Sequence, residues 1–158
     1  MQRIYFDNAA TTMLDSEVLA AMMPFLTEHF GNPSTQYSFG RDTRAAVEEA
    51  RKTIAQLINA SAGEIIFTSG ATEANNMAIK GSVNYLGVER IITSPIEHHC
   101  VEYSVDFCRD NLHVETAMVK IDGNGNVDLE DLENLLKASD KKTLVTLMHA
   151  NNEIGTLL

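Results

Sequence analysis

The sequence predicts an α/β fold in which a largely parallel sheet is flanked by helices. Two observations indicate this class. From residue 64 onward, short apolar segments alternate with longer segments whose apolar residues recur at helical spacing. The connections between these segments are mostly short, which is typical of successive strand–helix–strand units.

The first third of the chain predicts mainly helices. Residues 3–6 form a short strand-like start. Asp15 or Ser16 can cap a helix that runs toward Phe30, and Pro24 inside that helix predicts a kink. A clearer helix follows, whose apolar residues at helical spacing are Val47, Ala50, Ile54, Leu57 and Ile58.

The remaining two thirds predict alternating strands and helices. The expected strands span 65–68, 90–93, 114–121 and 144–148. One expected helix spans 72–85, a second begins near His98, and a third is capped by Asp128. The second helix carries one apolar stripe, made of Val101, Ser104, Val105 and Cys108.

Composition narrows the class of protein. A formal net charge of −10, with only 12 Lys and Arg residues that are scattered along the chain, argues against a nucleic-acid partner and against anionic membranes. We find no apolar stretch long enough for a signal peptide or a membrane span. Two cysteines, Cys100 and Cys108, are too few for a disulfide framework and predict a reducing, cytoplasmic setting.

Polar residues follow three of the four expected strands. Gly70, Ala71 and Thr72 follow the first, Glu97 and His98 the second, and Asn151, Asn152 and Glu153 the last. In open α/β sheets, ligands bind outside the carboxyl ends of the strands. We therefore expect these groups to gather at one edge of the sheet.

The segment 69–73 predicts an anion site, because small residues between a strand and a helix direct backbone N–H groups to one point in front of the helix dipole. A plain capping function is the alternative. Thr72 could be the N-cap, bonding a backbone N–H near Asn75, and Glu73 could simply favour the first helical turn.

Metal and thiol chemistry have less support. His98 could be a helix-start residue without a role, and the adjacent Glu97, His98, His99 and Cys100 lack the usual metal-ligand spacing. The loop after Asp122 matches calcium-ligand positions but has Val127 where the calcium loop needs Gly. We expect no metal, and we expect both cysteines to be buried.

Five motifs, taken together and in order along the chain, resemble the cysteine desulfurases related to nitrogen-fixation and iron–sulfur-cluster assembly proteins, within the class V aminotransferases. They are Tyr5-Phe6-Asp7-Asn8-Ala9-Ala10-Thr11-Thr12, Phe30-Gly31-Asn32-Pro33-Ser34, Ile66-Phe67-Thr68-Ser69-Gly70-Ala71-Thr72-Glu73, Glu97-His98 and Met148-His149-Ala150-Asn151-Asn152-Glu153-Ile154-Gly155. Two departures are Tyr37, where the family often has His, and the pair His99-Cys100, where many members have a small or basic residue and then Ala.

The resemblance implies a pyridoxal 5'-phosphate enzyme of fold type I (aspartate-aminotransferase-like), working as a homodimer. Such enzymes convert L-cysteine to L-alanine and pass the sulfur, as an enzyme persulfide, to an iron–sulfur scaffold or other acceptor protein. By position, Ala71 and Thr72 would hold the phosphate, His98 would stack on the pyridine ring and assist proton transfer, and Asn152 would bond its phenolic oxygen. Asn8 and Ala9 would lie near the substrate.

The resemblance covers well under half of a family member. Residues 1–14 would form a segment near the substrate site and the small domain, and 15–158 the first part of the cofactor-binding large domain. No Lys here matches the Schiff-base lysine, and the persulfide cysteine is also absent. We therefore expect a fragment that is inactive by itself, whose strand 65–68 would lack a neighbour.

Two other interpretations stay open. A sister enzyme, such as a selenocysteine lyase or a class V aminotransferase, would share the phosphate turn and the stacking histidine. A non-catalytic interaction fragment would fit the missing lysine.

Overall fold

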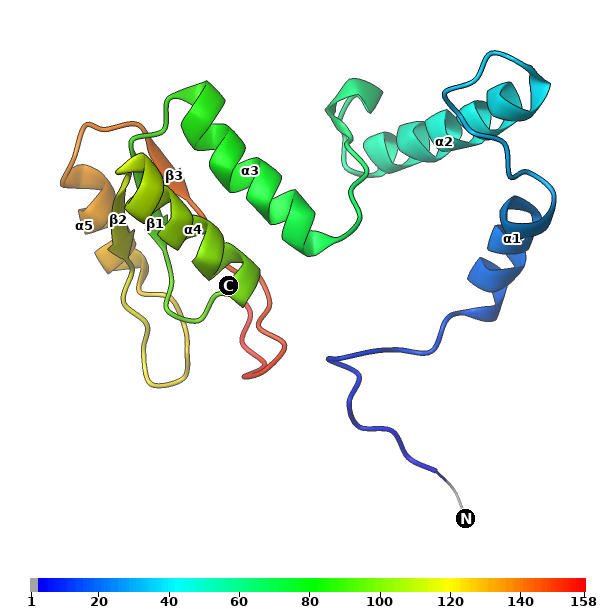
Figure 1. Ribbon diagram of the computed structural model, residues 1–158. Helices are drawn as coiled ribbons and strands as arrows, with labels where there is room; N and C mark the ends of the chain where they lie inside the picture. The colour runs from blue at the N-terminus through cyan, green and yellow to red at the C-terminus, as the bar shows by residue number, and fades with distance from the viewer. Residues whose placement is uncertain (1–2) are drawn as a thin grey trace. The chain divides into compact units, whose positions relative to one another are not determined.

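The computed structural model describes residues 3–158, which form two compact units that divide after Phe67 (Figure 1). Each unit is described by itself below.

The unit that ends at Phe67 consists of helices and extended segments. Helix α1 spans Ser16–Thr27, α2 spans Ser38–Leu57, and a short 3-10 helix spans Ala62–Glu64. The Asp15 carboxylate caps α1, as predicted, by accepting from the N–H groups of Glu17 at 2.7 Å and Val18 at 3.3 Å. Helix α1 ends before Phe30, because the Pro24 carbonyl accepts from both Glu28 and His29 and closes the last turn.

Two strand predictions in this unit are wrong. Neither 3–6 nor 65–68 is a strand in the described part of the chain. A strand exists only when a neighbour satisfies its backbone groups. The segment after the 3-10 helix is instead held by Arg51, whose guanidinium donates to the Ile65 carbonyl and lies 4.9 Å from the Phe67 ring centre.

The unit Thr68–Leu158 contains a three-stranded parallel sheet. The strands β1 (Arg90–Thr93), β2 (Glu115–Met118) and β3 (Thr143–Val145) lie in the order β2-β1-β3, with Ile91 opposite Thr116 on one side and Leu144 on the other. The predicted parallel α/β arrangement is confirmed. All four residues of β1 are buried, as expected for a central strand.

Strands β2 and β3 are shorter than predicted, because carboxylates replace strand partners beyond their ends. The Val119 N–H still bonds the Thr93 carbonyl, but the Lys120 N–H bonds the Asp131 carboxylate at 3.0 Å. After β3, the Met148 N–H bonds the Glu97 carboxylate at 2.7 Å. Both strands therefore give way to loops held by side chains.

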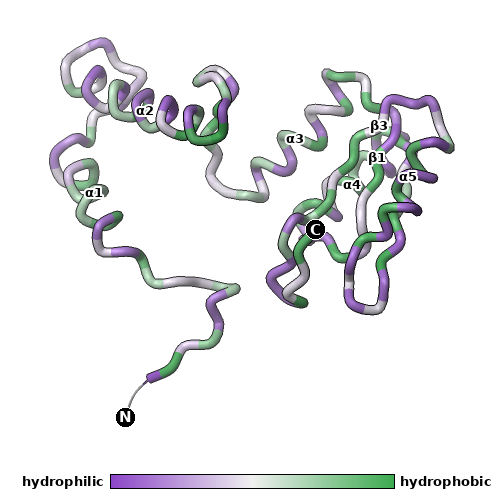
Figure 2. The backbone as a smooth tube through the Cα atoms, turned by 180° about the vertical axis from the view of Figure 1, so that it is seen from behind, coloured by the Kyte–Doolittle hydropathy of each residue, from purple (hydrophilic) through white to green (hydrophobic). Residues whose placement is uncertain are grey.

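Three helices flank the sheet: α3 (Ala71–Leu86), α4 (His99–Leu112) and α5 (Leu129–Lys137). Asp128 caps α5, as predicted, by accepting from the Asp131 N–H at 3.0 Å. Polar and apolar positions alternate along α5 (Figure 2). The Arg90 guanidinium reaches its Leu135 carbonyl at 2.6 Å from the sheet face opposite to that of Ile91.

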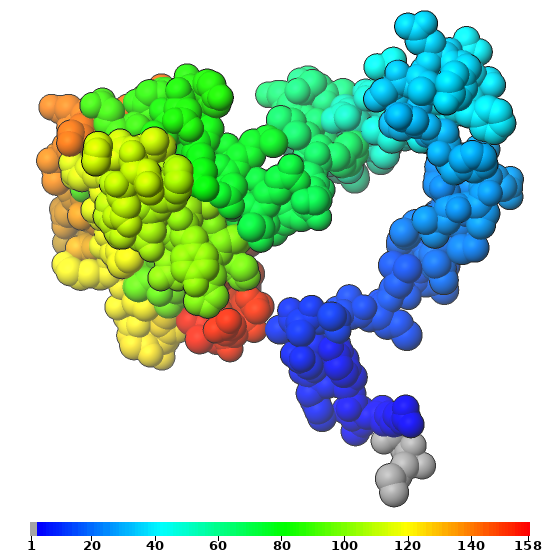
Figure 3. Space-filling model, in the orientation of Figure 1, coloured from blue at the N-terminus to red at the C-terminus, as the bar shows by residue number. Residues whose placement is uncertain are grey.

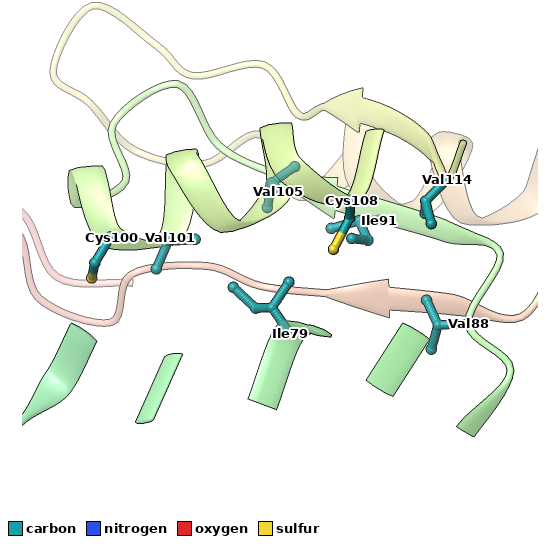
Figure 4. Packing of buried hydrophobic residues seen from close by; sticks show 8 residues of the cluster. All are labelled: Ile79, Val88, Ile91, Cys100, Val101, Val105, Cys108 and Val114. Carbon is teal, nitrogen blue, oxygen red and sulfur yellow. The ribbon is translucent and has the colours of Figure 1, made fainter. Parts of the chain in front are cut away.

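Helices α3 and α4 pack against each other over the face of the sheet that carries Ile91. The core between them includes both cysteines and the apolar members of the predicted α4 stripe, Val101, Val105 and Cys108 (Figure 4), and Ser104 of the same stripe is buried as well. Its buried residues are Ile79, Val88, Ile91, Cys100, Val101, Val105, Cys108 and Val114. This packing fixes the start of α3 relative to the start of α4, where the candidate site lies.

Candidate functional site at the carboxyl edge of the sheet

The loops that leave β1 and β3 emerge at the same edge of the sheet, because the strands are parallel. Two side chains join these loops. One carboxylate oxygen of Glu97 accepts from the Ser94 hydroxyl at 2.9 Å and from the Met148 N–H at 2.7 Å. The Asn151 amide donates to the Ile96 carbonyl at 3.0 Å. The C-terminal residues, red in Figure 3, accordingly lie on the surface beside the start of α4.

His98 lies on this edge as the N-cap of α4. Its Nδ1 accepts from the Cys100 N–H at 3.1 Å, which orients the imidazole. The Cys100 Sγ lies 2.9 Å from the same nitrogen, and the Asn75 amide donates to Sγ at 3.1 Å. Asn75 belongs to the first turns of α3, so these contacts tie the start of α3 to His98.

The turn 69–73 leaves the N-terminus of α3 open. Gly70 is the N-cap and offers no side-chain hydrogen bond, so the alternative in which Thr72 caps the helix is wrong. Thr72 instead lies inside the first turn, where its carbonyl accepts from the Asn76 amide at 2.8 Å. Ala71 and Thr72 are exposed, and a Cβ added at Gly70 would meet no atom within 4 Å. Their backbone N–H groups therefore face open space in front of the helix dipole.

Glu73 occupies the turn without blocking those N–H groups. Its carboxylate accepts from the Ser69 N–H and from the Ser69 hydroxyl, both at 2.7 Å. These two hydrogen bonds lower the pKa of the Glu73 carboxyl. Ser69 and Glu73 thus fix the shape of the turn, while Ala71 and Thr72 remain available to an anion.

Asn152 lies on the same edge, in a surface hollow of about 400 Å³. The histidine that lines this hollow is His99, not His98. The other lining residues are Pro95, Ile96, Glu97, Glu102, Asn151, Glu153 and Ile154. The structure therefore joins Ala71, Thr72 and His98 through Asn75 and Cys100, and places Asn152 on the neighbouring loop after β3.

Asn8 and Ala9 lie in the other unit, in an exposed turn where the Asp7 carbonyl accepts from the N–H groups of Ala10 at 3.1 Å and Thr11 at 3.3 Å. Their nearness to a substrate stays a prediction.

Other ligand classes find little support between residues 3 and 158. No group of three or more His, Cys, Asp or Glu side chains in this range could hold a metal ion. The Asp122 carboxylate closes a tight turn, accepting from the N–H groups of Asn124 at 2.8 Å and Asn126 at 2.9 Å. Within the same range, each helix is too short or too polar to cross a membrane.

Comparison with known proteins assigns the family. The sequence profile described as Aminotransferase class-V matches residues 4–158. The chain belongs to the aminotransferase class-V family. Within that family it is similar to the cysteine desulfurase IscS of Dictyoglomus turgidum, 52% identical over 159 residues that make up 99% of this chain and 39% of that protein. It is 46% identical to a mitosomal cysteine desulfurase of Trachipleistophora hominis, over 98% of this chain and 36% of that protein.

Solved structures of other proteins show the same fold. A NifS-like protein matches with a TM-score of 0.89 and 38% identity, over 99% of this chain and 43% of its own. A structure described as SspA in complex with cysteine matches with a TM-score of 0.84 and 35% identity, over 97% of this chain and 44% of its own. These matches confirm the predicted fold and the predicted resemblance to cysteine desulfurases. The chain spans about two fifths of the length of these relatives.

The sequence does not predict two features of this edge: that Glu97 and Asn151, expected here, bridge two loops, and that Asn75 and Cys100 take part at all. For Glu97 and Asn151, the position directly after a strand is the signal that each could bridge two loops. For Cys100 the signal was its place two residues after an N-cap, where a backbone N–H turns back toward the cap.

Proposed function

We propose that this chain is the N-terminal part of a pyridoxal-phosphate-dependent cysteine desulfurase. In the proposed reaction the carbon–sulfur bond of L-cysteine breaks, the sulfur passes to an enzyme thiolate as a persulfide, and a proton takes its place to give L-alanine. The family, the names of the relatives and the neighbour described with bound cysteine all support this reaction. The observation that carries the proposal is the open start of α3, tied to His98 at the carboxyl edge of the sheet.

The residues at this edge fit the cofactor's chemistry. A phosphate dianion suits the free N–H groups and the Thr72 hydroxyl at the start of α3, because the helix dipole adds positive potential there. The exposed His98 ring offers a flat face for a flat heterocycle, and the Asn152 amide offers a donor to a phenolate. When bound, pyridoxal 5'-phosphate supplies an electron sink that stabilises negative charge on the substrate carbon.

In this proposal the residues have different tasks. Ala71 and Thr72 bind the phosphate, Asn152 orients the ring, and His98 contacts the ring and moves a proton at the imidazole nitrogen that faces outward. Asn8 and Ala9 would contact the substrate. We further propose a homodimer that works in the cytoplasm and delivers sulfur to an iron–sulfur scaffold or another acceptor protein.

The test is to express the intact gene, record the visible absorbance of bound cofactor and assay sulfide released from L-cysteine. We expect both signals. Absence of cofactor absorbance would contradict the proposal, and absorbance without sulfide would favour a sister enzyme of the same family, such as a selenocysteine lyase or an aminotransferase.

The phosphate site has its own test in that protein. Thr72→Ala should weaken binding of pyridoxal 5'-phosphate about 10-fold, the effect of removing one hydrogen bond to a charged group. Titration of absorbance measures the dissociation constant. Binding of pyridoxal, which lacks the phosphate, should be unchanged, and Thr53→Ala on α2 should change neither. Equal weakening for pyridoxal would place Thr72 elsewhere on the cofactor.

A further inference from the structure

Three side chains from two segments, α3 and the start of α4, meet at His98. The Asn75 amide of α3 lies 3.1 Å from Cys100 Sγ, and Sγ lies 2.9 Å from His98 Nδ1. Cys100 is buried at one end of the core between α3 and α4 (Figure 4), whereas His98 is exposed. The thiol therefore lies behind the imidazole, on the protein side of the ring.

Donor and acceptor roles in this group follow from one bond. The Cys100 N–H can only donate, and it donates to His98 Nδ1 at 3.1 Å, so Nδ1 is an acceptor and carries no proton. The Asn75 NH2 group can only donate, so Sγ accepts from it. The thiol hydrogen is then available as a second donor to Nδ1, sharing its lone pair with the backbone N–H. The hydrogen bonds then all run in one direction: Asn75 donates to Cys100, and Cys100 donates to His98.

We infer that Cys100 is a positioning residue for His98: its thiol, held by Asn75, adds a second donor to the backbone N–H at Nδ1, and together they keep Nδ1 unprotonated and place the proton of the neutral ring on Nε2. The inference rests on the proposed function for its catalytic meaning, because Nε2 is then the nitrogen that faces a cofactor or substrate. It also links two parts of the site, since Asn75 lies one turn beyond the proposed phosphate-binding residues Ala71 and Thr72. Alanine at position 100 could make neither side-chain contact.

The first test reads the tautomer directly in the intact protein freed of cofactor. Long-range proton–nitrogen NMR of ring-labelled histidine, with His98→Gln to assign the signal, should show an unprotonated Nδ1 and a protonated Nε2 in the neutral ring. A wild-type ring with its proton on Nδ1 would overturn the inference. The tautomer is read in the wild-type protein, and His98→Gln serves only to assign its signal.

Variants at position 100 then measure the effect of the thiol on the tautomer of His98. Cys100→Ala should raise the Nδ1–H fraction about 5-fold, the change that one net hydrogen bond makes, whereas Cys100→Ser should retain the wild-type tautomer. The matched control is Cys108→Ala, because Cys108 is a fully buried thiol on the same helix in the same core. An equal shift in Cys108→Ala, or no shift in Cys100→Ala, would show that the thiol does not act on the ring.

Kinetics separate this inference from the proposed function. In the holoenzyme, Cys100→Ala should lower kcat about 5-fold with KM for L-cysteine nearly unchanged, and Cys100→Ser should restore most of it. If wild-type protein shows the Nε2–H tautomer but releases no sulfide, the proposed function fails alone. If sulfide is released while the tautomer is the opposite one, this inference fails alone.

Discussion

His98 is the residue on which the most chemistry converges, because it is both the N-cap of α4 and an exposed ring at the carboxyl edge of the sheet. Capping accounts for its orientation, and exposure accounts for its access to a ligand. The adjacent His99 is exposed as well, but its ring stacks on Tyr103 and its Nδ1 pairs with Glu102 at 3.1 Å. The two neighbours therefore have separable roles.

His98→Ala in the intact protein should leave the cofactor bound and lower kcat at least about 100-fold, the usual contribution of a general acid or base. Cofactor absorbance and sulfide release measure the two effects. His99→Ala is the matched control and should keep both signals. If His98→Ala turned over at the wild-type rate, the ring would have no part in proton transfer.

At the scale of the element, the start of α3 depends on a carboxylate. Ser69 lowers the pKa of Glu73 below its ordinary 4.5, so the ionised form stabilises the fold. That contribution is complete above pH 4.5 and is lost as the pH falls through the lower pKa of the folded state.

Glu73→Gln should accordingly reduce Tm at neutral pH and make the acid-side decline in Tm shallower, so that the two proteins converge once the pH falls below the lowered pKa of the folded-state carboxyl. Calorimetry across this range measures the effect. Ser69→Ala should reproduce part of the effect, because it removes the hydroxyl donor and leaves the backbone N–H that also bonds Glu73. The double variant should lose little more than Glu73→Gln alone, because the hydroxyl acts through the Glu73 carboxylate. Additive losses would mean that Ser69 and Glu73 act separately.

The central strand is the second element with a sharp prediction. Ile91 is fully buried between α3, α4 and the sheet. Ile91→Ala should lower the free energy of unfolding by about 3 kcal/mol, because it removes transfer energy and leaves a cavity. Denaturant titration of the intact protein measures it, with Leu129→Ala, at a position 66% exposed, as the control expected to lose less than about 1 kcal/mol. If Ile91→Ala and Leu129→Ala lowered the free energy of unfolding by similar amounts, Ile91 would not belong to the core.

Prediction from sequence succeeded for elements whose evidence is local. Asp15 and Asp128 were recognisable caps, and the stripe of α4 was readable from helical spacing. It failed for 3–6 and 65–68, because apolar content does not make a strand without a paired neighbour, and for 65–68 the resemblance itself implied that the neighbour is absent. At the site, sequence placed polar residues at the correct sheet edge, but the contact from Asn75 to Cys100 arises only from the packing of α3 on α4.

At the scale of the whole molecule, apolar residues are unevenly buried. No residue of α1 is buried, and its large apolar side chains are exposed. They are Val18, Leu19, Met22, Met23, Phe25 and Leu26. Exposed apolar surface on this scale is typical of a face that another protein segment covers.

The 158-residue chain by itself should therefore enhance the fluorescence of a hydrophobic dye such as ANS several-fold. Leu19→Lys together with Met22→Lys should remove much of that signal, whereas Thr53→Lys on α2 should not. The intact protein should show little enhancement. If the chain does not enhance the fluorescence of the dye, these side chains are buried against other parts of the same chain.

The strand order β2-β1-β3 also determines the order in which the strands can pair while the chain is being translated. Strand β1 can pair with β2 as soon as Met118 leaves the ribosome, but its other edge stays open until Thr143 follows. At usual translation rates the intervening residues take about 1–5 s, far longer than local folding. The nascent chain thus presents a half-paired, apolar strand during that interval, and slowing translation over 119–142 should increase its demand for chaperones.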